Sequence, residues 1–77
     1  MKMFPASVAI EALSKGAAVE VDARHCTQAE REALCDAARD GGARVTLRNA
    51  HAVCRSDALL LAVRGGKALC LDFTSAD

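Results

Sequence analysis

Gly42-Ala43-Arg44-Val45-Thr46-Leu47-Arg48 lies at the centre of this 77-residue chain, and two other segments match it without gaps. They are Gly16-Ala17-Ala18-Val19-Glu20-Val21-Asp22 and Gly66-Lys67-Ala68-Leu69-Cys70-Leu71-Asp72, at offsets of 26 and 24 residues. Each segment begins with glycine and ends in alternating apolar and polar residues, which is typical of a strand with one buried face. A period of roughly 20–50 residues predicts a repeat architecture.

A helix-like stretch precedes each of the three glycines. The first helix is predicted over residues 5–15, with Pro5 at a first helical position that tolerates its missing N–H. The second begins at the capping box Thr27-Gln28-Ala29-Glu30 and ends at Gly41-Gly42. Its apolar stripe comprises Ala29, Ala33, Leu34, Ala37 and Ala38. The third begins near residue 56, and its large apolar residues are Leu59, Leu60 and Val63.

Strands are expected over residues 18–23, 44–49 and 67–73. Because a helix lies between successive strands, we expect right-handed parallel βαβ units. Strands covered by helices on both faces would be almost continuously apolar, whereas these alternate. The sequence therefore predicts one α/β domain over residues 1–77, built from three αβ repeats. Its three-stranded parallel sheet would run in chain order, with the helices on one face and the other face open.

The open face is the predicted binding surface. Its candidate residues are Glu20, Asp22, Arg44, Thr46, Arg48, Cys70 and Asp72. The register places Asp22, Arg48 and Asp72 in one row across strands spaced about 4.8 Å apart, so the arginine could lie between two carboxylates. Such a row is either a solvated charge ladder, worth at most about 1 kcal/mol for each pair, or a ligand site.

Composition excludes several classes of function. The chain has 10 basic and 10 acidic residues and no formal net charge, whereas nonspecific binding to nucleic acid or anionic membranes needs a basic surplus. Phe4 and Phe73 are its only aromatic residues, too few for a base-stacking platform. No apolar run approaches the roughly 20 residues of a membrane span. We therefore expect a cytoplasmic protein with reduced cysteines, and its frequent alanine and arginine suggest a bacterial source.

Two histidines occupy equivalent repeat positions, just past the carboxyl ends of the first two strands. Ligands of open α/β sheets bind at that edge, and His25, Cys26, His51 and Cys54 are of the residue types that ligate zinc. Their spacings are not those of zinc motifs, and adjacent histidine and cysteine ligands are awkward on one metal. We therefore predict no metal or cofactor and treat these four residues as candidates only.

Thiol chemistry is a further alternative. Cys26 lies beside His25 and near Asp22, which supplies the residue types of a nucleophile, a base and an orienting acid. Cys35 lies off the apolar stripe of the second helix, on its outer flank, so it could be an exposed reactive thiol, and Cys70 faces the open sheet. The competing interpretation is that all four cysteines are small apolar filler, and no catalytic residue is predicted.

The repeated Gly-x-x-Val-x-Leu spacing resembles a leucine-rich-repeat βα solenoid over residues 12–73. Val45-Thr46-Leu47-Arg48-Asn49 is close to the strand signature of that family. This resemblance implies a protein-recognition scaffold that uses its exposed sheet face.

The segment from Asp36 to Ala50 is similar to the helix-to-strand passage of STAS domains, the fold of anti-sigma-factor antagonists. That resemblance implies regulation by phosphorylation of a serine or threonine at a helix start, where this chain has Thr27.

Taken together, these patterns predict a small non-catalytic module that binds a protein partner, or a second copy of itself, through the open sheet face or an edge strand. The first and third strands are edges, whose unpaired backbone groups invite pairing unless charges prevent it. The alternatives are a STAS-type regulatory domain and a small protein with a metal or thiol site built from histidine and cysteine.

Overall fold

Helices and strands alternate along the chain, as predicted. The computed structural model describes residues 6–74. The main elements are α1 (Ala6–Ser14), β1 (Val19–Asp22), α2 (Gln28–Gly41), β2 (Val45–Arg48), α3 (Arg55–Gly65) and β3 (Leu69–Leu71). Short 3-10 turns connect them, namely η1 (Ala23–His25), η2 (Ala50–Ala52) and η3 (Gly66–Ala68). The predicted helix start at Pro5 lies outside the described residues. Within residues 6–74, no helix has the length and apolar character needed to cross a bilayer.

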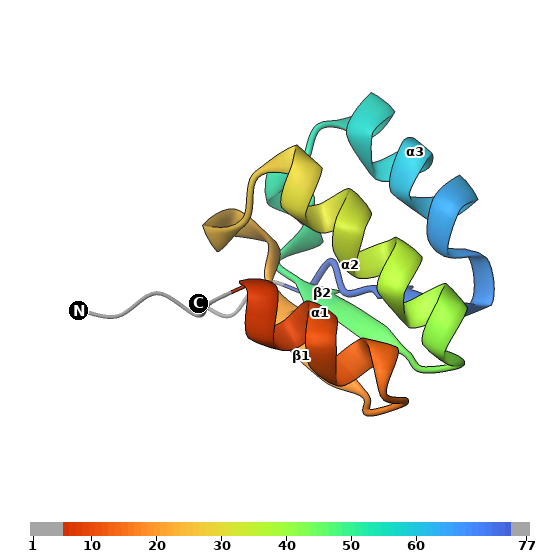
Figure 1. Ribbon diagram of the computed structural model, residues 1–77. Coiled ribbons are helices and arrows are strands. Elements are labelled where there is room, and N and C mark those ends of the chain that lie inside the picture. Colours follow the sequence, from red (N-terminus) through yellow and green to blue (C-terminus); the bar gives the residue numbers. More distant parts are fainter. Residues whose placement is uncertain (1–5, 75–77) are drawn as a thin grey trace.

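The sheet has the predicted topology. Its strand order is β1-β2-β3, and both neighbouring pairs are parallel. Val45 lies opposite Val19 and Leu69, and Thr46 lies opposite Glu20 and Cys70. Figure 1 shows α1, α2 and α3 as one layer on the same side of the sheet. The structure is therefore an α/β fold with one covered face and one open face.

The helix ends are set by the residues that the sequence indicates. Gly16, Gly42 and Gly66, which lead the three matching segments, all have positive φ, at 94°, 66° and 53°. Side-chain-bearing residues adopt this conformation at a cost, so glycine is favoured at each exit. At the start of α2, the N–H of Glu30 donates to Thr27 Oγ1 at 3.1 Å, and the N–H of Thr27 donates to Glu30 Oε1 at 2.8 Å. The predicted capping box is confirmed.

The core lies between the sheet and the helix layer, with α2 in the middle. The largest fully buried side chains are those of Leu13, Leu34, Cys35, Val45, Leu47 and Leu61. Cys35 is fully buried, which corrects the expectation that it could be an exposed thiol. The predicted apolar stripe included only the side of α2 that faces the sheet. In the structure, α3 also packs against the outer flank of α2. Gly65 of α3 also lies against this flank, where a Cβ would be in ordinary contact with Cys35 Sγ, at 3.4 Å, and would collide with Leu69 Cβ, at 2.7 Å.

We expect Gly41→Ala to destabilise the fold more than Gly42→Ala. A Cβ at Gly41 would collide with the carbonyl oxygen of Leu13, so α1 and α2 would have to separate, at roughly 2–3 kcal/mol. A Cβ at Gly42 meets nothing within 4 Å, so only its left-handed backbone opposes alanine, at about 1 kcal/mol. Urea denaturation of both variants measures the difference. An equal or smaller loss for Gly41→Ala would contradict the close helix contact.

Candidate functional site

The predicted binding residues lie on the open face of the sheet. Glu20, Arg44 and Arg48 are exposed there. Asp22, Thr46, Cys70 and Asp72 are partly buried. Asp22 lies opposite Arg48 in register. The hydrogen-bond ladder between β2 and β3 continues past the end of β3. The N–H of Asp72 donates to the carbonyl oxygen of Leu47, and the N–H of Ala50 donates to the carbonyl oxygen of Asp72. The result is a polar surface with both signs of charge.

Asp22 does not pair with Arg48, which corrects the expectation of an arginine held between two carboxylates. Its carboxylate instead accepts the backbone N–H of Arg24 at 2.9 Å, and Arg24 Nη2 lies 2.9 Å from Asp22 Oδ2. These hydrogen bonds from Arg24 hold the pKa of Asp22 well below its usual range. The turn η1 directly follows β1, and Asp22 caps it by accepting the N–H of Arg24, so the turn brings Arg24 to this carboxylate. Among residues 6–74, Arg48 makes no ion pair within 4 Å.

Asn49 is a structural residue of this site that was not among the predicted binding residues. It is 4% exposed, and its φ of 57° is the only positive value of a non-glycine residue within the described range. Its Nδ2 donates to Asp22 Oδ2 at 3.1 Å, which ties the end of β2 to the end of β1. The signal was available, because asparagine directly after a strand is among the residues that best tolerate left-handed backbone.

The histidines and cysteines are not gathered into a chemical centre. The turns η1 and η2 contact each other, and His25 and His51, one on each turn, are both exposed. Cys26 is partly buried, with Sγ 3.7 Å from the carbonyl oxygen of Asp22, whereas Cys54 is exposed. Within residues 6–74, no three His, Cys, Asp or Glu side chains are grouped so that they could hold a metal ion.

Two thiols, those of Cys26 and Cys35, have raised rather than lowered pKa values. Burial raises the pKa of Cys26, and it raises the pKa of Cys35 to about 11. A nucleophilic cysteine needs a stabilised thiolate and therefore a lowered pKa. The surroundings of these two cysteines favour the interpretation that they fill space in the core.

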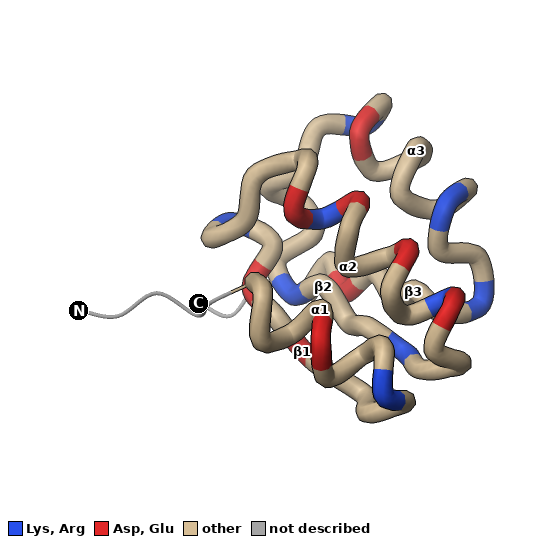
Figure 2. The backbone as a smooth tube through the Cα atoms, viewed as in Figure 1, with Lys and Arg blue, Asp and Glu red and all other residues tan. Residues whose placement is uncertain are grey.

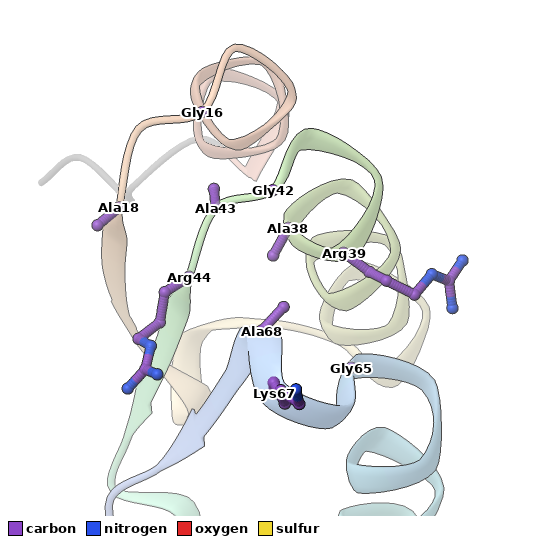
Figure 3. A pocket seen from close by; sticks show the side chains of 10 residues that line it. All are labelled: Gly16, Ala18, Ala38, Arg39, Gly42, Ala43, Arg44, Gly65, Lys67 and Ala68. Carbon is purple, nitrogen blue, oxygen red and sulfur yellow. The ribbon is translucent and has the colours of Figure 1, made fainter.

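A basic hollow of about 580 Å³ lies where the strands begin, with Arg39, Arg44 and Lys67 among its lining residues. Figure 3 shows that Arg39 and Arg44 extend in different directions, away from a common centre. Arg39 is also engaged, because it donates to the Arg64 carbonyl oxygen at 2.9 Å and pairs with Asp36 and Asp40. The helices end at this hollow, and their carbonyl groups carry partial negative charge. The arrangement is therefore poorly suited to binding an anion.

Four of the five exposed large apolar side chains, those of Leu59, Leu60, Val63 and Phe73, lie at the opposite edge of the sheet from β1. We call this region the α3–β3 surface and define it by Leu59, Leu60, Val63, Leu71 and Phe73. Leu59 is 54% exposed and Val63 83% exposed. Between α3 and β3 there is a hollow of about 380 Å³, to which Leu59, Leu71 and Phe73 contribute. Large apolar patches of this kind mark interaction sites on soluble proteins.

The sequence pattern of α3 could not reveal this surface. It identified Leu59, Leu60 and Val63 as the apolar residues of the helix, but the structure buries Ala58, Leu61 and Gly65 instead. The six residues from Ala58 to Val63 are all apolar, so the helical period does not indicate which side faces the sheet.

Within residues 6–74, the fold and this surface define a small α/β domain with an open sheet face and two strand edges, at β1 and β3, that pair with no further strand. Comparison of the chain with known protein families, with curated proteins and with solved structures finds no match.

We expect Asn49→Ala to lower the free energy of unfolding by about 2 kcal/mol, because it removes a buried hydrogen bond and leaves alanine in a left-handed conformation. Asn49→Gly is the matched control, since it removes the same amide without the steric penalty, and it should lose less. Thermal and urea denaturation measure both changes. Equal losses for the two variants would contradict the role of the backbone conformation.

We expect iodoacetamide to modify Cys54 first and Cys35 last in the folded protein at pH 8. Cys54 is exposed, whereas Cys35 is fully buried with a pKa of about 11, so it is rarely ionised or accessible. Mass spectrometry of the alkylated peptides over time gives the order, and unfolding in urea should make all four cysteines reactive. Modification of Cys35 as fast as Cys54 would show that α3 does not cover this flank of α2.

Proposed function

We propose that this protein is a non-catalytic interaction module that binds a protein partner through the β3 edge and the adjoining α3–β3 surface. The observation that carries the proposal is the juxtaposition of a free strand edge and an exposed apolar helix face at one end of the sheet. The matching partner is a protein surface that offers a strand edge and an apolar patch side by side.

The free edge of β3 supplies main-chain hydrogen bonding. Both backbone groups of Asp72 bond toward β2, so the alternation of a parallel strand points the N–H and C=O of Leu69 and Leu71 outward. Leu69 and Leu71 are only partly buried, whereas Val45 and Leu47 at the equivalent positions of β2 are fully buried. A strand added at this edge would bond to those outward groups and cover the two leucines.

The apolar residues of α3 supply the free energy of association. Burial of the exposed half of a leucine contributes roughly 1 kcal/mol, so several such residues together would contribute several kcal/mol toward the cost of association. The charged residues of the open face lie alongside, and Cys70 and Asp72 belong to β3 itself. Exposed ion pairs add little affinity, so the charges would orient a partner and the apolar residues would hold it.

Three further observations support the remaining parts of this proposal. The raised pKa values of Cys26 and Cys35 favour a non-catalytic role. The zero net charge favours a protein partner over nucleic acid or an anionic membrane. The four cysteines are free thiols, which supports a cytoplasmic location.

We expect Leu59→Glu to weaken partner binding at least about tenfold, because it places a charge in a desolvated contact. Val8→Glu is the matched control, since Val8 on α1 is 56% exposed and lies at the other end of the helix layer. Both variants and the unmodified chain would serve as baits, and each captured protein would then be purified and its affinity measured by calorimetry.

A partner that loses affinity for Leu59→Glu and keeps it for Val8→Glu supports the proposed surface. A partner that binds both variants equally contradicts it and directs attention to the open sheet face, where Arg48→Glu is the corresponding variant.

A further inference from the structure

The hollow between α3 and β3 owes its space to small side chains on the helix. The residues that line it from α3 are Arg55, Ala58, Leu59 and Ala62. Their spacing of three or four residues places them on one face of the helix. Two of the four are alanines, which leave the space that larger side chains would fill. The volume of about 380 Å³ is within the range of sites for small molecules, roughly 300–1,000 Å³.

The body of this hollow is apolar on both sides. Leu71 of β3 and Phe73 just beyond it line the hollow from the side of the sheet. Leu59 is 54% exposed and Phe73 58% exposed, so both present apolar area that a bound molecule would cover. Burial of apolar area supplies most of the free energy with which proteins bind small molecules.

Two nitrogen-bearing side chains, those of His51 and Arg55, also line the hollow, and both residues are exposed. Within residues 6–74, Arg55 makes no ion pair within 4 Å, and no acidic residue lines the hollow. Asp57 and Asp72 are next to lining residues in the chain, but the carboxylate of Asp72 accepts a backbone N–H. A guanidinium group without a partner is complementary to a carboxylate, which it can bind through two parallel hydrogen bonds.

The basic side chains lie at one end of the hollow. Arg55 is the first residue of α3, and His51 belongs to the turn η2 that precedes this helix. Ala62 lies seven residues further along α3, or about 10 Å. Figure 2 shows that the charged positions of α3 are near its two ends, with an uncharged stretch between them. The hollow therefore has a basic end and an apolar body.

We infer that this hollow is a binding site for a small carboxylic acid with an apolar chain. Arg55 and His51 would bind the carboxylate, and the apolar chain would lie between Leu59 and Phe73. A water-sized group occupies about 30 Å³, so the hollow accommodates about a dozen non-hydrogen atoms, which is the size of a medium-chain fatty acid.

This inference goes beyond the proposed function and does not depend on it. Leu60 and Val63 are not among the residues that line the hollow, so a bound acid would leave them and the β3 edge to a protein partner.

The test is a titration of the full chain, labelled with ¹⁵N, with sodium octanoate, followed by the NMR shifts of its backbone amides. We expect saturable shifts at Arg55, Leu59 and Phe73 with a dissociation constant of about 1 mM or less. Octan-1-ol has the same chain without the charge and should bind at least about fivefold more weakly. Acetate has the charge without the chain and should give no saturable shift over the same range.

Two variants separate the roles of the basic end and the apolar body, and circular dichroism confirms that each is folded. Arg55→Gln should weaken octanoate binding at least about fivefold and leave octan-1-ol binding unchanged. Lys15→Gln is the control, since it removes an exposed positive charge just beyond α1, and it should bind octanoate normally. Ala62→Leu should weaken the binding of both molecules, because leucine fills part of the hollow.

Every other outcome overturns the inference. The site is absent if octanoate gives no saturable shift at these amides up to about 10 mM. Shifts confined to another part of the chain place the site elsewhere. Equal effects of Arg55→Gln and Lys15→Gln show that Arg55 does not bind the carboxylate, and unchanged binding by Ala62→Leu shows that the chain does not enter the hollow. No protein partner takes part in this titration, so its failure leaves the proposed function to the test with Leu59→Glu.

Discussion

The packing of α2 between its neighbours is the contact on which this fold depends. This helix touches α1, α3, β2 and β3, and it contributes Leu34, Cys35, Ala37 and Ala38 to the core. A small group allows the approach on the α1 side, where Gly41 lies against the backbone of α1, and Gly65 of α3 makes room for Leu69 at the start of β3. Alanine accounts for 17 of the 77 residues. The core is therefore thin, and close contact of helix backbones replaces the volume that larger side chains would fill.

Local signals in the sequence were sufficient to predict the architecture of the fold. The glycines at 16, 42 and 66 and the capping box at Thr27 act within a few residues of the chain, so their effect can be read without knowledge of the fold. The alternation in the strands, together with the helices between them, was sufficient to predict a parallel sheet with one open face.

Local signals of this kind could not predict the contacts between elements. Cys35 was misplaced because its burial depends on a second helix, which no pattern within α2 can indicate. The pairing of Asp22 with Arg24 and Asn49 depends on how the chain turns after β1 and β2, and the register alone favoured Arg48. The sequence could not predict which side of α3 is exposed, because residues 58–63 are all apolar and such a run has no helical periodicity. The candidate surface thus emerges only when the elements are placed together.

The shortness of β3 has a kinetic consequence. With three residues, it offers few outward main-chain groups, so a strand added there gains only a short ladder and the apolar side chains of α3 must supply most of the attraction. Complexes held mainly by a small apolar patch dissociate quickly, because few bonds must break together. The proposed complex would therefore exchange between bound and unbound forms rather than assemble permanently.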